Sequence, residues 1–105
     1  MNVEDRLDIL QKIAEYSYTF DGNDAEGWAD TFTEGGVWDC IIKGKEEEPV
    51  AHLAGRAALL EFAANNHKTK PDTIRSFHHQ SGTFFEEQAP ETARTRTMVI
   101  ITVHD

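Results

Sequence analysis

The stretch EYSYTFDGND, residues 15–24, decides the fold, because it ends an amphipathic helix with an acid on the helix's apolar side. Side chains that recur at steps of three and four before Asp21 are mostly apolar or small, which is typical of a helix packed on a core. Burying an unpaired carboxylate on such a face costs several kcal/mol, so Asp21 needs a partner or a proton. The members of this stripe are Leu7, Leu10, Ile13, Ala14, Ser17, Phe20 and Asp21.

The best partner for Asp21 is His78, which lies in the strand-like run RSFHH, residues 75–79. A carboxylate at the negative end of a helix dipole favours a cationic neighbour, and an imidazole accepts and donates protons near neutral pH. The alternative is an ordinary turn aspartate that bonds the amides of Asn23 or Asp24. The first interpretation predicts a contact between the first helix and a strand far along the chain.

Periodicity and breakers around this stretch predict three helices and four strands. Gly22 permits the left-handed turn that ends the first helix, and Asn23 with Glu26 is a plausible capping box for the second. The expected helices cover residues 3–20, 23–35 and 56–65, and the expected strands cover residues 37–42, 50–53, 74–86 and 92–104.

This order of elements predicts an α+β fold, with helices on one side of a curved, mostly antiparallel sheet that encloses a pocket. The run Met98-Val99-Ile100-Ile101 is apolar on both faces of its strand, so we expect the third helix, a partner subunit or both to cover it. A homodimer is therefore expected.

Length and charge limit the class of protein. A chain of 105 residues is expected to form a single domain, residues 1–105. Its net charge of -9, from 19 acidic and 10 basic residues, repels phosphate backbones and anionic lipids, so we expect no nucleic-acid and no membrane partner. The N-terminus has no basic start followed by an apolar stretch, which favours a cytoplasmic protein.

The sequence offers little support for a metal or a cofactor. His78 and His79 are neighbours on a strand and point to opposite faces, so they cannot easily share one ion. Cys40 is the only cysteine, and it has no glycine-rich elbow or base beside it. We expect Arg75, Arg94 and Arg96 to be surface or interface groups that pair with the excess of acid.

Several short motifs together resemble a known family. Residues 16–24 through Trp28 and Phe32, then Gly55-Arg56 at the start of a helix, then residues 75–78 and Gly82-Thr83, resemble the SnoaL-like branch of the NTF2-like superfamily. Within that branch the chain is most similar to scytalone dehydratase and its bacterial relatives. Family members usually carry further strands, so the resemblance implies either a minimal domain or one that lacks C-terminal strands.

The resemblance implies a reaction. In the dehydratase an aspartate at the end of the first helix pairs with a histidine on the sheet, and the matching positions are Asp21 and His78. His78 would then remove a proton next to a carbonyl and return it to a departing hydroxyl, while Asp21 orients the ring. The chain departs from the family where the dehydratase has tyrosines, because Phe20 and the Trp38-Asp39 pair stand there.

A second catalytic arrangement resembles ketosteroid isomerase, a more distant relative. That enzyme pairs a tyrosine of the first helix with an aspartate base near the first strand, and Tyr16 and Asp39 fall close to those places. The isomerase's second, protonated acid has no clear counterpart among residues 98–103. Asp39 is otherwise an ordinary polar residue of an edge strand.

The leading hypothesis is a cofactor-independent lyase or isomerase that acts on a small apolar carbonyl compound, with Tyr16 or Tyr18 as a candidate donor to the carbonyl. The rivals are a non-catalytic module that binds a small molecule or dimerises, and a small subunit of a larger oxygenase. The side chains expected to line the substrate pocket or core are Tyr18, Phe20, Trp28, Trp38, Phe62 and Phe84.

Overall fold

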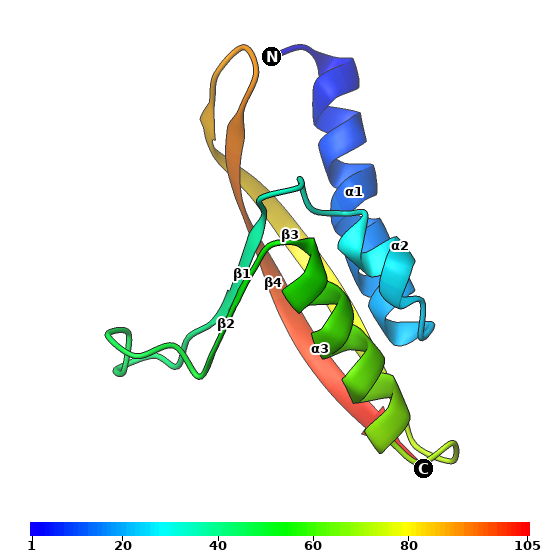
Figure 1. Ribbon diagram of the computed structural model, residues 1–105. Helices are drawn as coiled ribbons and strands as arrows, with labels where there is room; N and C mark the ends of the chain where they lie inside the picture. The colour runs from blue at the N-terminus through cyan, green and yellow to red at the C-terminus, as the bar shows by residue number, and fades with distance from the viewer.

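The computed structural model describes residues 1–105, and its three helices and four strands form an α+β fold (Figure 1). This confirms the expected fold class. The strands form two separate antiparallel hairpins, β1–β2 and β3–β4, because the two short strands pair only with each other. The elements are α1 (Val3–Asp21), α2 (Ala25–Ala29), β1 (Val37–Cys40), β2 (Ala51–Ala54), α3 (Arg56–Thr69), β3 (Arg75–Gln88) and β4 (Ala93–His104).

The turn between α1 and α2 differs in detail from the expected one. Asn23 takes the left-handed conformation with φ 60°, whereas Gly22 has φ -85°. Asparagine tolerates that conformation better than most residues, so the glycine is not the residue that reverses the chain. Asp24, not Asn23, caps α2 by accepting a hydrogen bond from the Gly27 amide at 2.9 Å. The expected capping box of Asn23 and Glu26 is therefore wrong, because the N-cap is the next residue, Asp24.

The core lies among α2, α3 and the C-terminal half of α1, which lie together in Figure 1. Leu7 and Leu10 of the expected helical stripe are 58% and 39% exposed, because the N-terminal half of α1 extends past this core. Four side chains are fully buried, namely Trp28, Ala29, Leu59 and Ala63, and aromatic rings surround them, including Tyr16, Phe20, Phe32, Trp38 and Phe62.

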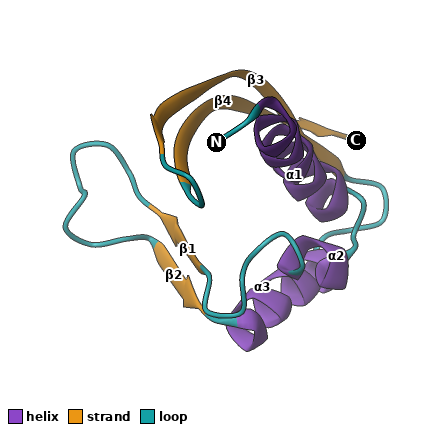
Figure 2. Ribbon diagram, turned by 90° about the horizontal axis from the view of Figure 1, so that it is seen from above, coloured by secondary structure: helices purple, strands orange, loops and turns teal.

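The β3–β4 hairpin is the longest element and curves alongside α1 (Figure 2). Its register runs from Arg75 opposite His104 to Gln88 opposite Ala93, with two irregular steps. Gly82 lies at the first irregular step with φ 63°, and a Cβ there would lie 2.9 Å from the end of the Met98 side chain. Only glycine fits this bend without strain.

The apolar run of β4 is not covered within this chain. Met98, Val99, Ile100 and Ile101 are 47–70% exposed, because α3 packs on α2 and β2 instead. The expectation that the third helix covers this strand is therefore wrong, while cover by a partner subunit stays a prediction. None of the three helices combines the length and the apolar composition that a membrane-spanning helix needs.

Candidate functional site

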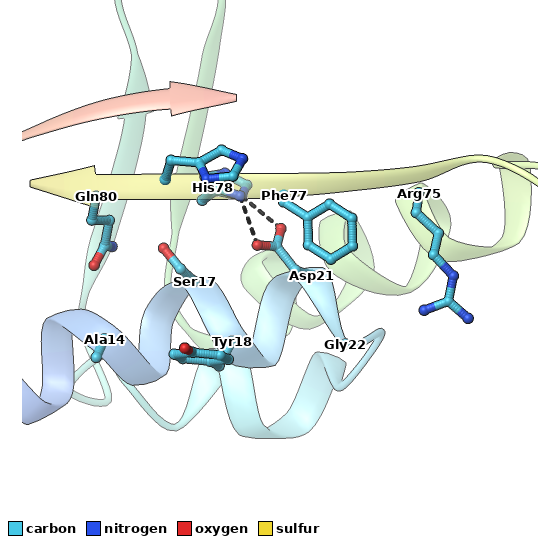
Figure 3. Close-up of a pocket in the computed structure, with 10 residues that line it drawn as sticks. Ala14, Ser17, Tyr18, Asp21, Gly22, Arg75, Phe77, His78 and Gln80 are labelled. Atoms are coloured by element: carbon cyan, nitrogen blue, oxygen red, sulfur yellow. Dashed lines mark hydrogen bonds and ion pairs between the residues drawn. The ribbon is translucent and has the colours of Figure 1, made fainter. Parts of the chain in front are cut away.

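Asp21 and His78 meet where the end of α1 lies against β3. The Asp21 Oδ1 atom lies 2.7 Å from the Nδ1 atom of His78, and Oδ2 accepts a hydrogen bond from the His78 backbone amide, also at 2.7 Å (Figure 3). The two side chains are only 11% and 13% exposed. The structure thus brings together the two residues that the sequence pairs across 57 positions.

The contact between Asp21 and His78 is possible because β3 is an edge strand. β3 has a strand neighbour on one side only, so the His78 amide has no strand partner on the other side. The carboxylate of Asp21 satisfies this amide and the imidazole together. An ionised carboxylate only accepts hydrogen bonds, so Nδ1 carries a hydrogen, and in the neutral ring the lone pair of the imidazole is then on Nε2. Nε2 has no hydrogen-bond partner in the protein, which leaves it able to take a proton.

Aromatic rings hold the imidazole from the side of the core. The Phe20 ring meets the His78 ring edge to face with centroids 5.7 Å apart, and the Tyr16 ring does so at 6.3 Å. These contacts and the carboxylate restrict rotation of the ring. A base fixed in this way loses little entropy when it meets a substrate.

The largest crevice of the molecule lies between α1 and β3 and includes this pair. Its volume is about 660 Å³, which is in the usual range for a small-molecule site. Tyr18 forms part of its wall but is 81% exposed. The crevice is lined by Ala14, Ser17, Tyr18, Asp21, Gly22, Arg75, Phe77, His78, His79 and Gln80.

The structure does not bring Tyr16 and Asp39 together. The Trp38 indole donates a hydrogen bond to the Tyr16 hydroxyl at 2.7 Å, which places this hydroxyl among the core aromatics. Burial raises the pKa of Tyr16. Asp39 follows Trp38 on the strand, so it points to the opposite face, where it contacts His52. Neither Tyr16 nor Asp39 lines the crevice.

The aromatic residues expected in the pocket lie mostly elsewhere. Trp28 is fully buried in the core, and Trp38 packs on Phe62 with ring centroids 5.1 Å apart. Phe20 belongs to the same cluster, and Phe84 is 65% exposed on β3. Of the six expected side chains, only Tyr18 lines the crevice. The expectation failed for the others because apolar periodicity does not distinguish a core residue from one in a pocket wall.

Sequence reasoning missed Gln80. Its Nε2 atom donates to the Ile13 carbonyl of α1 at 3.0 Å, so it is a second polar contact between α1 and β3. Its place two residues after His78, on the same face of the strand, was the available signal.

Comparison with known proteins gives a family match over the whole chain. Residues 1–105 match the family of SnoaL-like domains. Comparison with curated proteins gives no match. Solved structures of similar fold include an aspartate-to-asparagine variant of Rv3472, a Mycobacterium tuberculosis protein of unknown function, at 27% identity and TM-score 0.74, over 92% of this chain and 50% of that one.

Two Novosphingobium aromaticivorans structures are also similar. One, a candidate aromatic ring hydroxylase, has 25% identity and TM-score 0.82, over 96% of this chain and 66% of that one. The other, a candidate scytalone dehydratase, has 22% identity and TM-score 0.77, over 95% of this chain and 60% of that one, and its likeness shows the fold. The chain thus spans between half and two-thirds of the length of these three structures.

Proposed function

The chain belongs to the SnoaL-like family, and on that premise we propose that it is a cofactor-independent lyase of the dehydratase type, or an isomerase, acting on a small carbonyl compound. The observation that carries the proposal is the orientation of His78. Its Nδ1 atom is held by Asp21 at 2.7 Å, while Nε2 has no partner in the protein. A histidine in this arrangement is a ready general base in a crevice of suitable volume.

The proposed reaction begins with removal of a proton next to the carbonyl. The C–H bond breaks, its proton goes to Nε2 of His78, and its electron pair forms an enolate. In a dehydratase the enolate then expels the hydroxyl on the next carbon, which leaves as water with the proton from His78. In an isomerase the proton returns to another carbon instead. Asp21 stabilises the imidazolium that exists between the two steps.

Two enolisable probes test this chemistry without knowledge of the native substrate. Phenylacetone in deuterium oxide reports proton removal, because NMR follows the exchange of its hydrogens next to the carbonyl. Diacetone alcohol reports dehydration, because its product is a conjugated enone that absorbs in the ultraviolet. We expect His78→Ala to lower the catalysed rate roughly 10²–10⁴-fold.

The chain supplies a matched control in its second histidine–aspartate pair. His52 contacts Asp39 on β1–β2, but the His52 side chain is 60% exposed and does not line the crevice. His52→Ala is expected to leave the rate unchanged. An equal loss in both variants, or no loss in His78→Ala, removes His78 from the mechanism. Native protein that binds the probes without converting them supports the non-catalytic binding module instead.

A further inference from the structure

Arg75 differs from every other arginine of the chain in having no partner. The expectation that the three strand arginines pair with acid holds for Arg94, which contacts Glu87 at 2.7 Å, and for Arg96, which contacts Glu86. It is wrong for Arg75, which forms no ion pair although the chain has 19 acidic residues. The other two arginines are also engaged, Arg6 over the Phe85 ring and Arg56 with Asp30.

Arg75 lies where two hollows of the surface meet. It lines the crevice beside His78 and also an adjoining polar hollow of about 350 Å³, and both hollows include Asp21. Asp21 already accepts two hydrogen bonds from His78, and Lys70 of the polar hollow donates to the Ser76 hydroxyl. The remaining acid there is Asp72, which forms no ion pair with Arg75. The guanidinium is therefore available to an anion from outside.

Ser17 is the second unpartnered polar group of the crevice. The side chain is 6% exposed, and its Oγ atom has no hydrogen-bond partner. A helical serine commonly bonds the carbonyl one turn earlier, but the Ile13 carbonyl accepts a hydrogen bond from Gln80. Thr19, by contrast, donates to the Glu15 carbonyl at 2.6 Å. Figure 3 shows the Ser17 hydroxyl directed toward β3, between Gln80 and His78.

We propose that the crevice binds a small carbonyl compound that carries one negative charge. Arg75 holds the anionic group, which is a carboxylate or a phenolate, because a guanidinium matches such oxygens with two parallel hydrogen bonds. The Ser17 hydroxyl donates to the carbonyl, and the Phe77 and Tyr18 side chains, which also line the crevice, contact the apolar part of the compound. The statement that this compound is the substrate rests on the proposed function. The statement that the crevice binds it is independent of the proposed function.

Binding of two isosteric probes tests the role of Arg75. Labelled protein is titrated with para-acetylbenzoate and with neutral para-acetylbenzamide, and NMR follows the amide resonances of Gly22 and Phe77. We expect the native protein to bind the carboxylate about tenfold more tightly than the amide. Arg75→Gln should abolish this preference, whereas Arg94→Gln, on the same sheet but paired with Glu87, should keep it. Equal binding of the probes, no binding of either, or a preference that survives in Arg75→Gln overturns the proposal.

A second pair of probes tests Ser17. Para-isopropylbenzoate has the shape of para-acetylbenzoate but no carbonyl. We expect the native protein to bind the acetyl probe several-fold more tightly, and Ser17→Ala to remove this advantage while the isopropyl probe binds as before. An advantage that persists in Ser17→Ala overturns this assignment.

The two proposals fail separately. If His78→Ala loses turnover but the native protein binds the charged and neutral probes equally, the catalytic proposal stands and the charge preference is refuted. If the charge preference depends on Arg75 but His78→Ala keeps full turnover, the binding site stands and the catalytic proposal is refuted.

Discussion

The helical core and the β3–β4 hairpin are held by different kinds of interaction. Trp28 and Leu59 are fully buried among aromatic rings, whereas Ile100 and Met98 on β4 are 70% and 64% exposed. Burial of apolar surface stabilises the first region at about 25 cal/mol per Å². The second region has few buried apolar contacts of its own, so it depends on what attaches it to α1.

That attachment is largely polar. Two oxygens of Asp21 hold His78, and Gln80 reaches the Ile13 carbonyl, all along the free side of β3. Hydrogen bonds that involve a charged group contribute about 1.5–3 kcal/mol each, more than neutral ones. Asp21 and His78 therefore lie at the junction of a well-packed and a poorly packed region, which gives the pair a structural role in addition to the proposed chemical one.

The largest effect expected from this comparison is on the core. Trp28→Ala should lower the free energy of unfolding by about 3–5 kcal/mol, because it leaves a cavity among rings that cannot close around it. Ile100→Ala is the matched change on the hairpin and should cost less than about 1 kcal/mol as long as the chain is monomeric, because Ile100 is then 70% exposed. Urea denaturation measures both. A large loss for Ile100→Ala would mean that this strand is covered, as the expected homodimer predicts, and sedimentation would then detect the partner copy.

The next effect is at the junction. Asp21→Asn removes the charge that accepts both hydrogen bonds from His78, so we expect a loss of about 1.5–3 kcal/mol in unfolding free energy. Hydrogen exchange at the His78 amide should become faster. Asp39→Asn is the control, since its exposed contact with His52 is worth less than about 1 kcal/mol. Equal stability of the two variants would contradict the proposed attachment.

The smallest effect concerns pH. Burial raises the pKa of Tyr16, so this hydroxyl ionises more readily in the unfolded chain, near pH 10, than in the folded one. The stabilisation it contributes is therefore complete below about pH 10 and is lost as the pH rises from there through the folded pKa. Tyr16→Phe should cost about 1 kcal/mol at neutral pH, because Trp38 loses its acceptor, and should flatten the alkaline loss of stability. If Tyr16→Phe loses as much stability at alkaline pH as the native protein does, the loss belongs to another titratable group.

The sequence predicted those features that depend on local pattern. The apolar periodicity gave the existence and order of all seven elements, and the acid on the apolar side of α1 gave the contact between Asp21 and His78. A charge on a core-facing position is informative because few arrangements can accommodate it.

The rest depends on tertiary geometry. The pattern of Leu7 and Leu10 matches that of buried residues, but the helical core does not extend to that end of α1, where Leu7 stays 58% exposed and Phe85 of β3 contacts Arg6. Trp38 and Asp39 alternate on a strand, and only the packing of β1 decides that the indole faces Tyr16 and the carboxylate faces away. The isolation of Arg75 depends on the positions of all 19 acids, which no local pattern contains.

The double contact of Asp21 also fixes how β3 is aligned with α1. If the strand slid by two residues, Ser76 or Gln80 would offer the carboxylate an equivalent amide, but the side chain of neither residue is an imidazole. A slip of one residue would turn His78 to the other face of the sheet. Among alignments that keep the same face of β3 toward α1, the observed one satisfies both oxygens and a shift by two residues does not, so this single side chain favours the observed alignment over those two.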